Sequence, residues 1–177
     1  FQYLKAMKAR SIRLSLVTYN SLLHACSRAG NMSLAYRLYM DMRRDKVSPD
    51  QITLNSLVLG YCNSGQISQA EILLTEFGSL GILPDRVTMN ILIHAFVKSE
   101  RITKAWSLVQ VMEKNGISPD HCTIRSLSTH CSSHVKDLLE LIEKYNIRTH
   151  LSTFSVMIES CLKQGADDEG IAIYEHK

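Results

Sequence analysis

The sequence predicts an all-α fold in which helical hairpins stack into one continuous solenoid, and three observations predict it. A four-residue motif returns every 35 residues, as Val17-Thr18-Tyr19-Asn20, Ile52-Thr53-Leu54-Asn55 and Val87-Thr88-Met89-Asn90. A Pro-Asp pair keeps the same step, at Pro49-Asp50, Pro84-Asp85 and Pro119-Asp120. Apolar residues between these motifs follow the spacing of a helix, and no segment alternates with the period of a strand. A fixed period of this length is typical of stacked units, each too small to bury its own apolar face.

Each unit begins with a predicted helix that carries the four-residue motif. In the first unit, Leu22 and Cys26 lie at helical spacing behind Thr18, a residue type that favours the N-cap position. We therefore expect a threonine to cap the first helix of every unit, at Thr18, Thr53, Thr88, Thr123 and Thr153. Gly30 and Gly65 follow the helices of the first two units, where a glycine commonly ends a helix.

A second predicted helix follows in each unit and completes the hairpin. Its N-caps are expected at Ser33, Ser68, Thr103 and Asp168. In the first unit, Ala35, Leu38 and Met42 give this helix an apolar stripe. The Pro-Asp turn then stops the helix, because proline cannot continue it and presets a turn.

The period divides the chain into one array that covers residues 1–177. We expect the end of a preceding repeat over 1–15, intact repeats over 16–50, 51–85 and 86–120, a short repeat over 121–150 and a partial repeat over 151–177. The short repeat has 30 residues in place of 35, and alignment of its second half places the gap near Ser132 to Val135. Because the chain begins at Phe1 and not at a Met, we expect a fragment of a longer protein, with any targeting segment outside it.

Composition narrows the possible classes of protein. A hydrophobic content of 45% argues against disorder. The formal charge of +3 and the pI near 8.6 permit an anionic partner without requiring one. No apolar run approaches the roughly 18 residues that a bilayer requires, so no membrane partner is expected. The five cysteines form no CxxC pair, and Cys26, Cys131 and Cys161 share one place in the predicted first helices, which indicates small core residues and a reducing compartment.

The motifs do not predict catalysis, a cofactor or a metal site. The sequence lacks a Gly-rich phosphate loop and a paired-His metal motif. Asp167, Asp168 and Glu169 stand at the start of a predicted helix, where the helix dipole favours acidic residues. We therefore expect no enzyme in this segment, while a catalytic domain elsewhere in the parent chain stays open.

The repeat pattern resembles that of the pentatricopeptide repeat family. The motif, the leucine pairs and small residues behind it, and the closing Pro-Asp agree in three consecutive units. A tetratricopeptide array, with about 34 residues per unit and a bulky Trp/Gly/Tyr pattern, fits less well. The resemblance implies a right-handed superhelix that binds single-stranded RNA, one base per repeat, in a mitochondrion or chloroplast. It implies a role in RNA processing, stability or translation, and a monomer within a larger chain.

In that family the fifth and the last residues of each repeat read the base. The matching residues here form three couples, Asn20 with Asp50, Asn55 with Asp85, and Asn90 with Asp120. An asparagine amide has both a donor and an acceptor for the edge of uracil, and a carboxylate beside it can hold its orientation. The resemblance therefore implies three successive U-preferring positions, with a U-rich RNA running 5′ to 3′ along the chain.

The resemblance also assigns the clamps and the phosphate contacts. The apolar residues that clamp each base are Val17, Ile52, Val87 and Cys122. The basic residues that face the phosphates are Arg28, Lys98 and Lys163, while Asn63 and Ser133 break the row. The fourth repeat has Arg125 at the reading position and His150 at the last position, and we assign no base to this pair or to Ser155 in the fifth repeat.

Structural explanations of the same residues stay open. The Asn and Asp side chains could serve only the helix ends, by satisfying free backbone donors and the helix dipole. The apolar second positions could pack between repeats. His24 and His94 are expected to line a groove or to pack, and Trp106 to lie in the core or between repeats.

A second functional hypothesis is a scaffold. The array could be a subunit of an organellar ribosome or transcription complex, or contact RNA-processing proteins, and the degenerate fourth repeat and the broken row of cations favour that role.

Overall fold

The computed structural model describes residues 13–175. It divides into two compact units, with the boundary between Pro84 and Asp85, inside a predicted Pro-Asp turn. The predicted end of a preceding repeat, residues 1–15, lies almost wholly outside the described residues.

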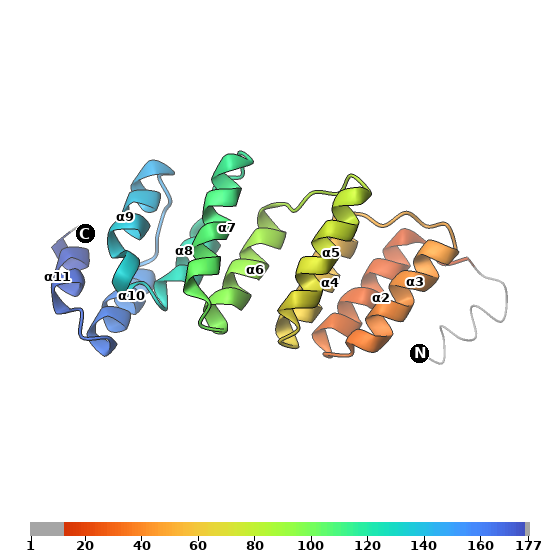
Figure 1. Ribbon diagram of the computed structural model, residues 1–177, viewed down its shortest axis with the longest axis horizontal. Helices are drawn as coiled ribbons and strands as arrows, with labels where there is room; N and C mark the ends of the chain where they lie inside the picture. Colours follow the sequence, from red (N-terminus) through yellow and green to blue (C-terminus); the bar gives the residue numbers. More distant parts are fainter. Residues whose placement is uncertain (1–12, 176–177) are drawn as a thin grey trace. The chain divides into compact units, whose positions relative to one another are not determined.

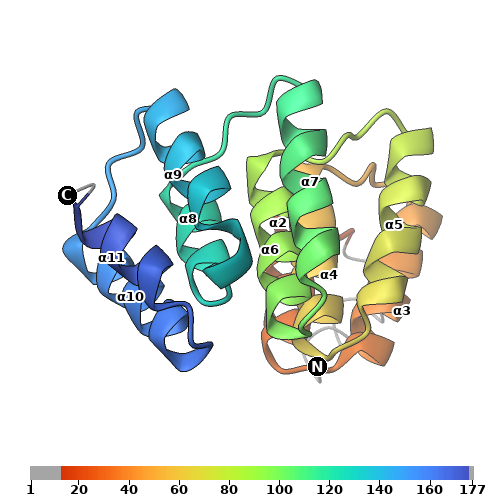
Figure 2. The ribbon, with the colours of Figure 1, turned by 60° about the vertical axis from the view of Figure 1, so that its left-hand side comes forward.

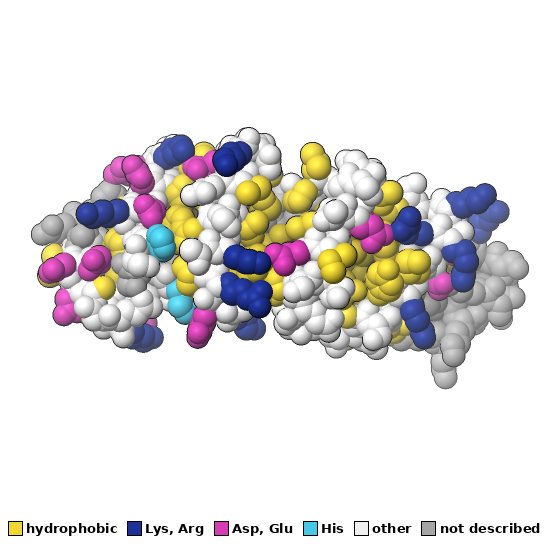
Figure 3. All heavy atoms as spheres, viewed as in Figure 1, with side chains coloured by type: hydrophobic (Ala, Val, Ile, Leu, Met, Phe, Trp, Pro, Cys, Tyr) yellow, Lys and Arg dark blue, Asp and Glu magenta, His cyan; other side chains and the backbone are white. Residues whose placement is uncertain are grey.

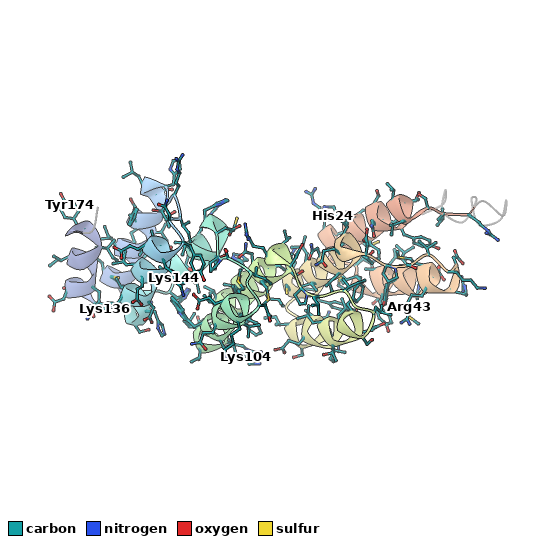
Figure 4. All side chains as sticks on the ribbon, turned by 90° about the horizontal axis from the view of Figure 1, so that it is seen from above. His24, Arg43, Lys104, Lys136, Lys144 and Tyr174 are labelled. Carbon is teal, nitrogen blue, oxygen red and sulfur yellow. The ribbon has the colours of Figure 1, made fainter. Side chains whose placement is uncertain are left out.

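The first unit consists of two helical hairpins (Figure 1). Its helices are α2 (Leu16–Arg28), α3 (Met32–Arg44), α4 (Gln51–Asn63) and α5 (Ile67–Ser79). The helix α2 packs on α3 within its hairpin and on α4 of the next hairpin, so that the first helices of the two hairpins are neighbours. Figure 4 shows His24 of α2 and Arg43 of α3 on opposite sides of this unit. The first helices therefore form one layer and the second helices another.

The second unit has two full hairpins and a third that ends the described chain (Figure 2). Its α-helices are α6 (Arg86–Lys98), α7 (Ile102–Lys114), α8 (His121–Ser128), α9 (Val135–Lys144), α10 (Leu151–Lys163) and α11 (Asp167–Glu175). The first helices again form one layer, because α8 packs on both α6 and α10. Over residues 13–175 no strand is present, which confirms the all-α prediction.

The first helices begin three residues earlier than predicted. The N-caps of α4, α6 and α8 are Asp50, Asp85 and Asp120, and each carboxylate accepts from the backbone N–H three residues on. The expected threonine caps were therefore wrong. Each of these threonines is the third helical residue, and its hydroxyl bonds back to the cap in a capping box. In α2 the cap is Ser15, and in α10 it is His150, which makes no side-chain cap hydrogen bond.

The caps of the second helices were also wrong, by two residues. The observed N-caps of α3, α5 and α7 are Asn31, Gln66 and Arg101. Only Asn31 bonds its helix, accepting from Leu34 N at 3.1 Å. Asp168 lies inside α11, which starts at Asp167. The helices α5 and α7 begin without a side-chain cap hydrogen bond, so we attribute the stability of their starts to packing within the hairpin.

Gly30 and Gly65 end the first helices as predicted, in the left-handed conformation with φ +69° and +73°. After α2, Asn31 N donates to Cys26 O at 3.0 Å and Gly30 N to Ser27 O at 3.2 Å, which satisfies free carbonyls at the helix end. Glu100 occupies the same place after α6 with φ +60°, although it has a Cβ.

The core consists of apolar side chains between the two layers of each unit. In the first unit Leu23, Leu38, Leu54 and Phe77 are buried, and in the second Leu92, Met112, Ile124 and Leu138. Cys26, Cys131 and Cys161 are buried, as predicted. Cys131, however, lies after the end of α8 and not on it. None of the described helices is both long enough and apolar enough to cross a bilayer.

The shortened repeat differs from the others at the connection between its helices. The first helix α8 has 8 residues, whereas α6 has 13. A short 3-10 helix, Ser132–His134, leads into α9. The missing residues therefore correspond to the end of the first helix and the turn behind it, next to the predicted position.

The layer of first helices depends on a close approach at Gly60. A Cβ on Gly60 of α4 would meet Met32 Sδ and lie 2.7 Å from Ser27 Oγ. Ser27 Oγ is buried and has no hydrogen-bond partner among the described residues. A larger residue at position 60 would therefore displace the contact between α4 and the first hairpin.

Gly60→Ala should lower the free energy of unfolding by roughly 1–3 kcal/mol, because an overfilled contact outweighs the better helix propensity of alanine. Urea unfolding followed by circular dichroism measures the change. The matched control is Gly78→Ala in α5, where a Cβ meets nothing within 4 Å. That control should stabilise by about 0.5–1 kcal/mol. A stabilising effect of Gly60→Ala would contradict the close approach.

Candidate functional site

The first predicted couple is joined directly in the structure. Asn20 Nδ2 of α2 donates to Asp50 Oδ1 at 3.0 Å. The Thr53 hydroxyl lies 2.7 Å from Asn20 Oδ1 and 2.9 Å from Asp50 Oδ1, and its single proton serves one of them. Thr53 N also donates to Asp50 Oδ1, at 2.9 Å. The couple is therefore a three-residue network at the junction of two successive first helices.

The third predicted couple repeats this network inside the second unit. Asn90 Nδ2 of α6 donates to Asp120 Oδ1 at 3.0 Å, and the Thr123 hydroxyl lies 2.7 Å from Asn90 Oδ1. Cys122 N donates to Asp120 Oδ1 at 3.0 Å. The same residue types give the same geometry in two separately described units, so the local sequence determines it.

The middle couple is divided between the units. Asn55 is a half-buried residue of α4 in the first unit. Asp85 is the N-cap of α6 in the second unit, where Thr88 N donates to Asp85 Oδ1 at 2.8 Å.

Each described network leaves part of its amide unused. Asn20 Nδ2 and Asn90 Nδ2 have two protons each and donate one to the aspartate, and each Oδ1 has two lone pairs and accepts from one threonine. One donor and one acceptor per amide remain. Asn20 is only 7% exposed, whereas Asn90 is half-buried. Asn90 thus presents more of its amide to a ligand.

The hydrogen bonds in the networks lower the pKa values of the two carboxylates. Burial acts to raise the pKa of Asp50, but hydrogen bonds from Thr53 and Asn20 outweigh it and hold the pKa below its usual value. The pKa of Asp120 is lowered in the same way: burial acts upward, and hydrogen bonds from Thr123, Asn90 and Cys122 act downward. Both aspartates therefore favour the ionised state, in which they accept from the amide.

The four predicted clamping residues lie at the surface of the first-helix layers. Val17, Ile52 and Val87 are 73%, 59% and 53% exposed, and Cys122 is exposed. This exposure contradicts the alternative that the second positions pack between repeats. Apolar side chains beside the polar networks are available to contact a flat ligand.

The three predicted phosphate contacts are exposed residues that end their helices. Arg28, Lys98 and Lys163 are the last residues of α2, α6 and α10. Lys163 lies 3.8 Å from Glu159, in an exposed pair of small energetic value. A cation at a helix C-terminus is also favoured by the helix dipole, so the structural role and the binding role coincide.

A hollow of about 1170 Å³ lies in the first-helix layer of the second unit, between α6, α8 and α10. It is lined by Lys98, Cys122, Arg125 and His150, which occupy positions where the family resemblance places RNA contacts. Its basic and titratable side chains, called the basic pocket below, are His94, Lys98, His121, Arg125, His130, Arg148 and His150. No Asp or Glu is among the described residues that line it.

The histidines and the tryptophan chosen from the sequence occupy different layers. His94 lines the basic pocket, which confirms its expected place in a groove, and His24 is exposed on α2. Trp106 of α7 is half-buried. The centroid of its ring lies 4.9 Å from that of His134 in the next hairpin, which confirms packing between repeats.

Three consecutive residues, Asp120, His121 and Cys122, bring potential metal ligands within 4.8 Å of one another. Asp120 Oδ1 already accepts from Asn90, Cys122 N and Thr123. His121 and Cys122 are exposed, and His121 Nε2 lies 3.4 Å from Cys122 Sγ. The group is explained by the start of α8, and we assign no metal to it.

Sequence reasoning missed the role of two residue types. Thr53 and Thr123 were predicted as helix caps, but their hydroxyls bind the asparagine of the preceding repeat. The signal was the recurrence of threonine with the same period as asparagine. Arg148 was not singled out, although it stands at a turn position where the other repeats have Ser48, Leu83 and Ser118.

Thr53→Val should lower the free energy of unfolding by about 1–3 kcal/mol, because it leaves the buried Asn20 Oδ1 and the N–H of Asp50 without their hydroxyl partner. Urea unfolding measures the change. Thr18→Val is the matched control, since among the described residues the Thr18 hydroxyl meets only the exposed Ser15 Oγ, at 3.0 Å. Equal destabilisation of the two variants would contradict the network.

The networks should also make the free energy of unfolding depend on pH. Because the folded-state pKa values of Asp50 and Asp120 are lowered, their contribution is present above the ordinary aspartate pKa of about 3.9 and is lost as the pH falls through the folded values. Urea midpoints measured from pH 7 to pH 3 should fall less for Asp120→Asn than for the parent chain. The same slope in both would show that Asp120 does not couple folding to protonation.

Comparisons with known proteins agree with the repeat pattern. The PPR repeat family matches residues 14–63, 49–98 and 84–133. The structure is similar to that of the pentatricopeptide repeat protein PPR10 from maize, with a TM-score of 0.83 and 25% identity over 97% of this chain. PPR10 in complex with an 18-nt psaJ RNA element gives a TM-score of 0.77 and 26% identity over 96% of this chain.

The chain spans about a quarter of the length of PPR10, 25% and 26% in these two structures. The PPR domain of the Arabidopsis thaliana protein-only RNase P 1, in complex with tRNA, shares the fold, with a TM-score of 0.68 and 16% identity over 88% of this chain and 84% of its own. Comparison with curated proteins gave no match. The matched segments cover well over half of the sequence, and the chain belongs to the pentatricopeptide repeat family.

Proposed function

We propose that the chain binds single-stranded RNA in its first-helix layers and reads bases through its asparagine–aspartate couples. The observation that carries the proposal is the repeated network, in which Asn20 and Asn90 are held 3.0 Å from Asp50 and Asp120. An amide held on both sides is pre-organised, so that a ligand does not have to order it. The RNA complex of PPR10, with its similar fold, supports the class of ligand.

The donor and the acceptor that the asparagine amide leaves unused favour uracil. Uracil offers a carbonyl acceptor next to an N–H donor, and the remaining donor and acceptor of Asn90 match this pair. The exposed Val87 of α6 and Cys122 of α8 would supply apolar surface for the faces of the base. A U-rich strand, read by Asn20, Asn55 and Asn90 in turn, is therefore the proposed ligand.

The proposed setting is the processing, stabilisation or translation of transcripts in a mitochondrion or chloroplast. Titration of the chain with U-rich and A-rich single strands at two salt concentrations tests the binding. We expect tighter binding of the U-rich strand and weaker binding at higher salt. A scaffold without RNA contacts would show neither effect, and that result would overturn the proposal.

Asn90→Ser should remove the preference for U at one position and move it toward a purine, because the shorter side chain makes fewer bonds and leaves room for a larger base. The expected loss of discrimination is about 10-fold, within the roughly 1–3 kcal/mol of a bidentate contact. Fluorescence anisotropy with strands that differ at one base measures it.

The matched control is Asn115→Ser, which removes an amide at the exposed C-cap of α7, outside the first-helix layer. It should bind all strands like the parent. If Asn90→Ser keeps the parent order of base preference, the assignment of the couple as a base reader is wrong.

A further inference from the structure

We infer that the basic pocket is a phosphate-binding site, which holds the RNA backbone beyond the last asparagine–aspartate couple. This inference rests on the proposed function and gives the fourth repeat a ligand in place of a base. It starts from charge: every ionisable side chain that lines the hollow, apart from the thiol of Cys122, is a lysine, an arginine or a histidine.

The fourth repeat inverts the chemistry of the couples. Arg125 stands where the intact repeats have asparagine, and His150 stands where they have aspartate. In the turn, Arg148 takes the place of uncharged residues, which are Ser48, Leu83 and Ser118 in the other repeats. An amide and a carboxylate are therefore replaced by a guanidinium and an imidazole, and a second guanidinium is added.

The shortened first helix supplies the room. Because α8 ends at Ser128, the residues behind it, Thr129 and His130, line the hollow in place of a further helical turn. On the far side, Ser152 and Thr153 of α10 add hydroxyl donors. The site is thus wide, and its donors come from α6, α8 and α10 and from the turns after α8 and before α10.

The cationic groups have few competing partners. Among the described residues, no salt bridge involves Arg125, Arg148 or Lys98. The adjacent carboxylate is that of Asp120, before His121, and its Oδ1 is occupied by Asn90, Thr123 and the N–H of Cys122. That carboxylate stays charged and acts on His121, but no described carboxylate forms a salt bridge with Arg125, Arg148 or Lys98, whose positive charge is therefore left for an external anion.

Phosphate is the anion that these groups suit. Guanidinium groups bind phosphate oxygens in a bidentate manner, and lysine binds them as a point charge. Lys98 belongs both to the pocket and to the row of exposed cations at helix ends, so the pocket continues that row within the second unit. A phosphodiester chain that leaves the Asn90–Asp120 network would meet it next.

The test compares three RNAs that carry the same three uridines. One has the uridines alone, the second adds four abasic residues on the 3′ side, and the third, the control, carries the same abasic residues on the 5′ side. The parent chain should bind the 3′ extension about 10-fold more tightly than the uridines alone, and Arg125→Gln/Arg148→Gln should abolish this gain. The slope of log binding constant against log salt concentration should become shallower in the variant by about 1.4, or about 0.7 for each phosphate that the variant no longer neutralises.

The control is Lys114→Gln/Lys136→Gln, which removes the same charge from exposed residues of α7 and α9. These helices belong to the second-helix layer, and on the face seen in Figure 3 basic and acidic side chains are mixed. The control should keep the gain from the 3′ extension. If the two double variants lose this gain in affinity equally, net charge explains the effect and the proposed site is wrong.

Tripolyphosphate, which has no base, separates this inference from the proposed function. Calorimetry should show one binding event with the parent chain and none with Arg125→Gln/Arg148→Gln, while circular dichroism confirms that the variant is folded. Equal binding by parent and variant would overturn the pocket. If tripolyphosphate binds the pocket but Asn90→Ser leaves base preference unchanged, base reading fails and the anion site stands.

Discussion

The start of each first helix constrains the rest of the structure. Asp50 and Asp120 cap α4 and α8, and the same carboxylate oxygen binds the asparagine of the preceding first helix. A single atom thus connects the local formation of a helix to the contact between two hairpins. The threonine of the capping box adds a second connection to the same asparagine. Because these bonds lie where successive first helices meet, helix start, stacking and side-chain presentation are determined together.

Much of this arrangement could be predicted from the sequence, because the period fixes which residues share an environment. Asn20 and Asp50 are far apart in the chain, yet their common recurrence indicated that they act together, and the structure joins them. The exact helix starts could not be predicted. Both Asp50 and Thr53 favour an N-cap, and the choice between them depends on the reciprocal bonds of the capping box. The recurrence of apolar residues at Val17, Ile52 and Val87 was clear from the period, and their proposed role as clamps came from the family resemblance, whereas their exposure needed the fold.

The fourth repeat shows where prediction from a periodic sequence ends. The sequence shows that Arg125 and His150 stand where the intact repeats have asparagine and aspartate. A comparison between repeats cannot assign a role to residues that occur in one repeat and not in the others. The pocket arises because α8 ends early and because Arg148 and His94, which lie far apart in the sequence, face the same hollow. Such a site depends on three helices at once, and local sequence patterns do not encode it.

The double role of the aspartates affects any attempt to redesign such an array for another target. Asn90 engages only its own network, while Asp120 also opens a helix that two neighbours pack against. If the couple reads a base as proposed, exchange of the amide changes what is recognised, whereas exchange of the carboxylate also weakens the helix start that it caps. The two residues of a couple therefore differ in how freely they can be replaced.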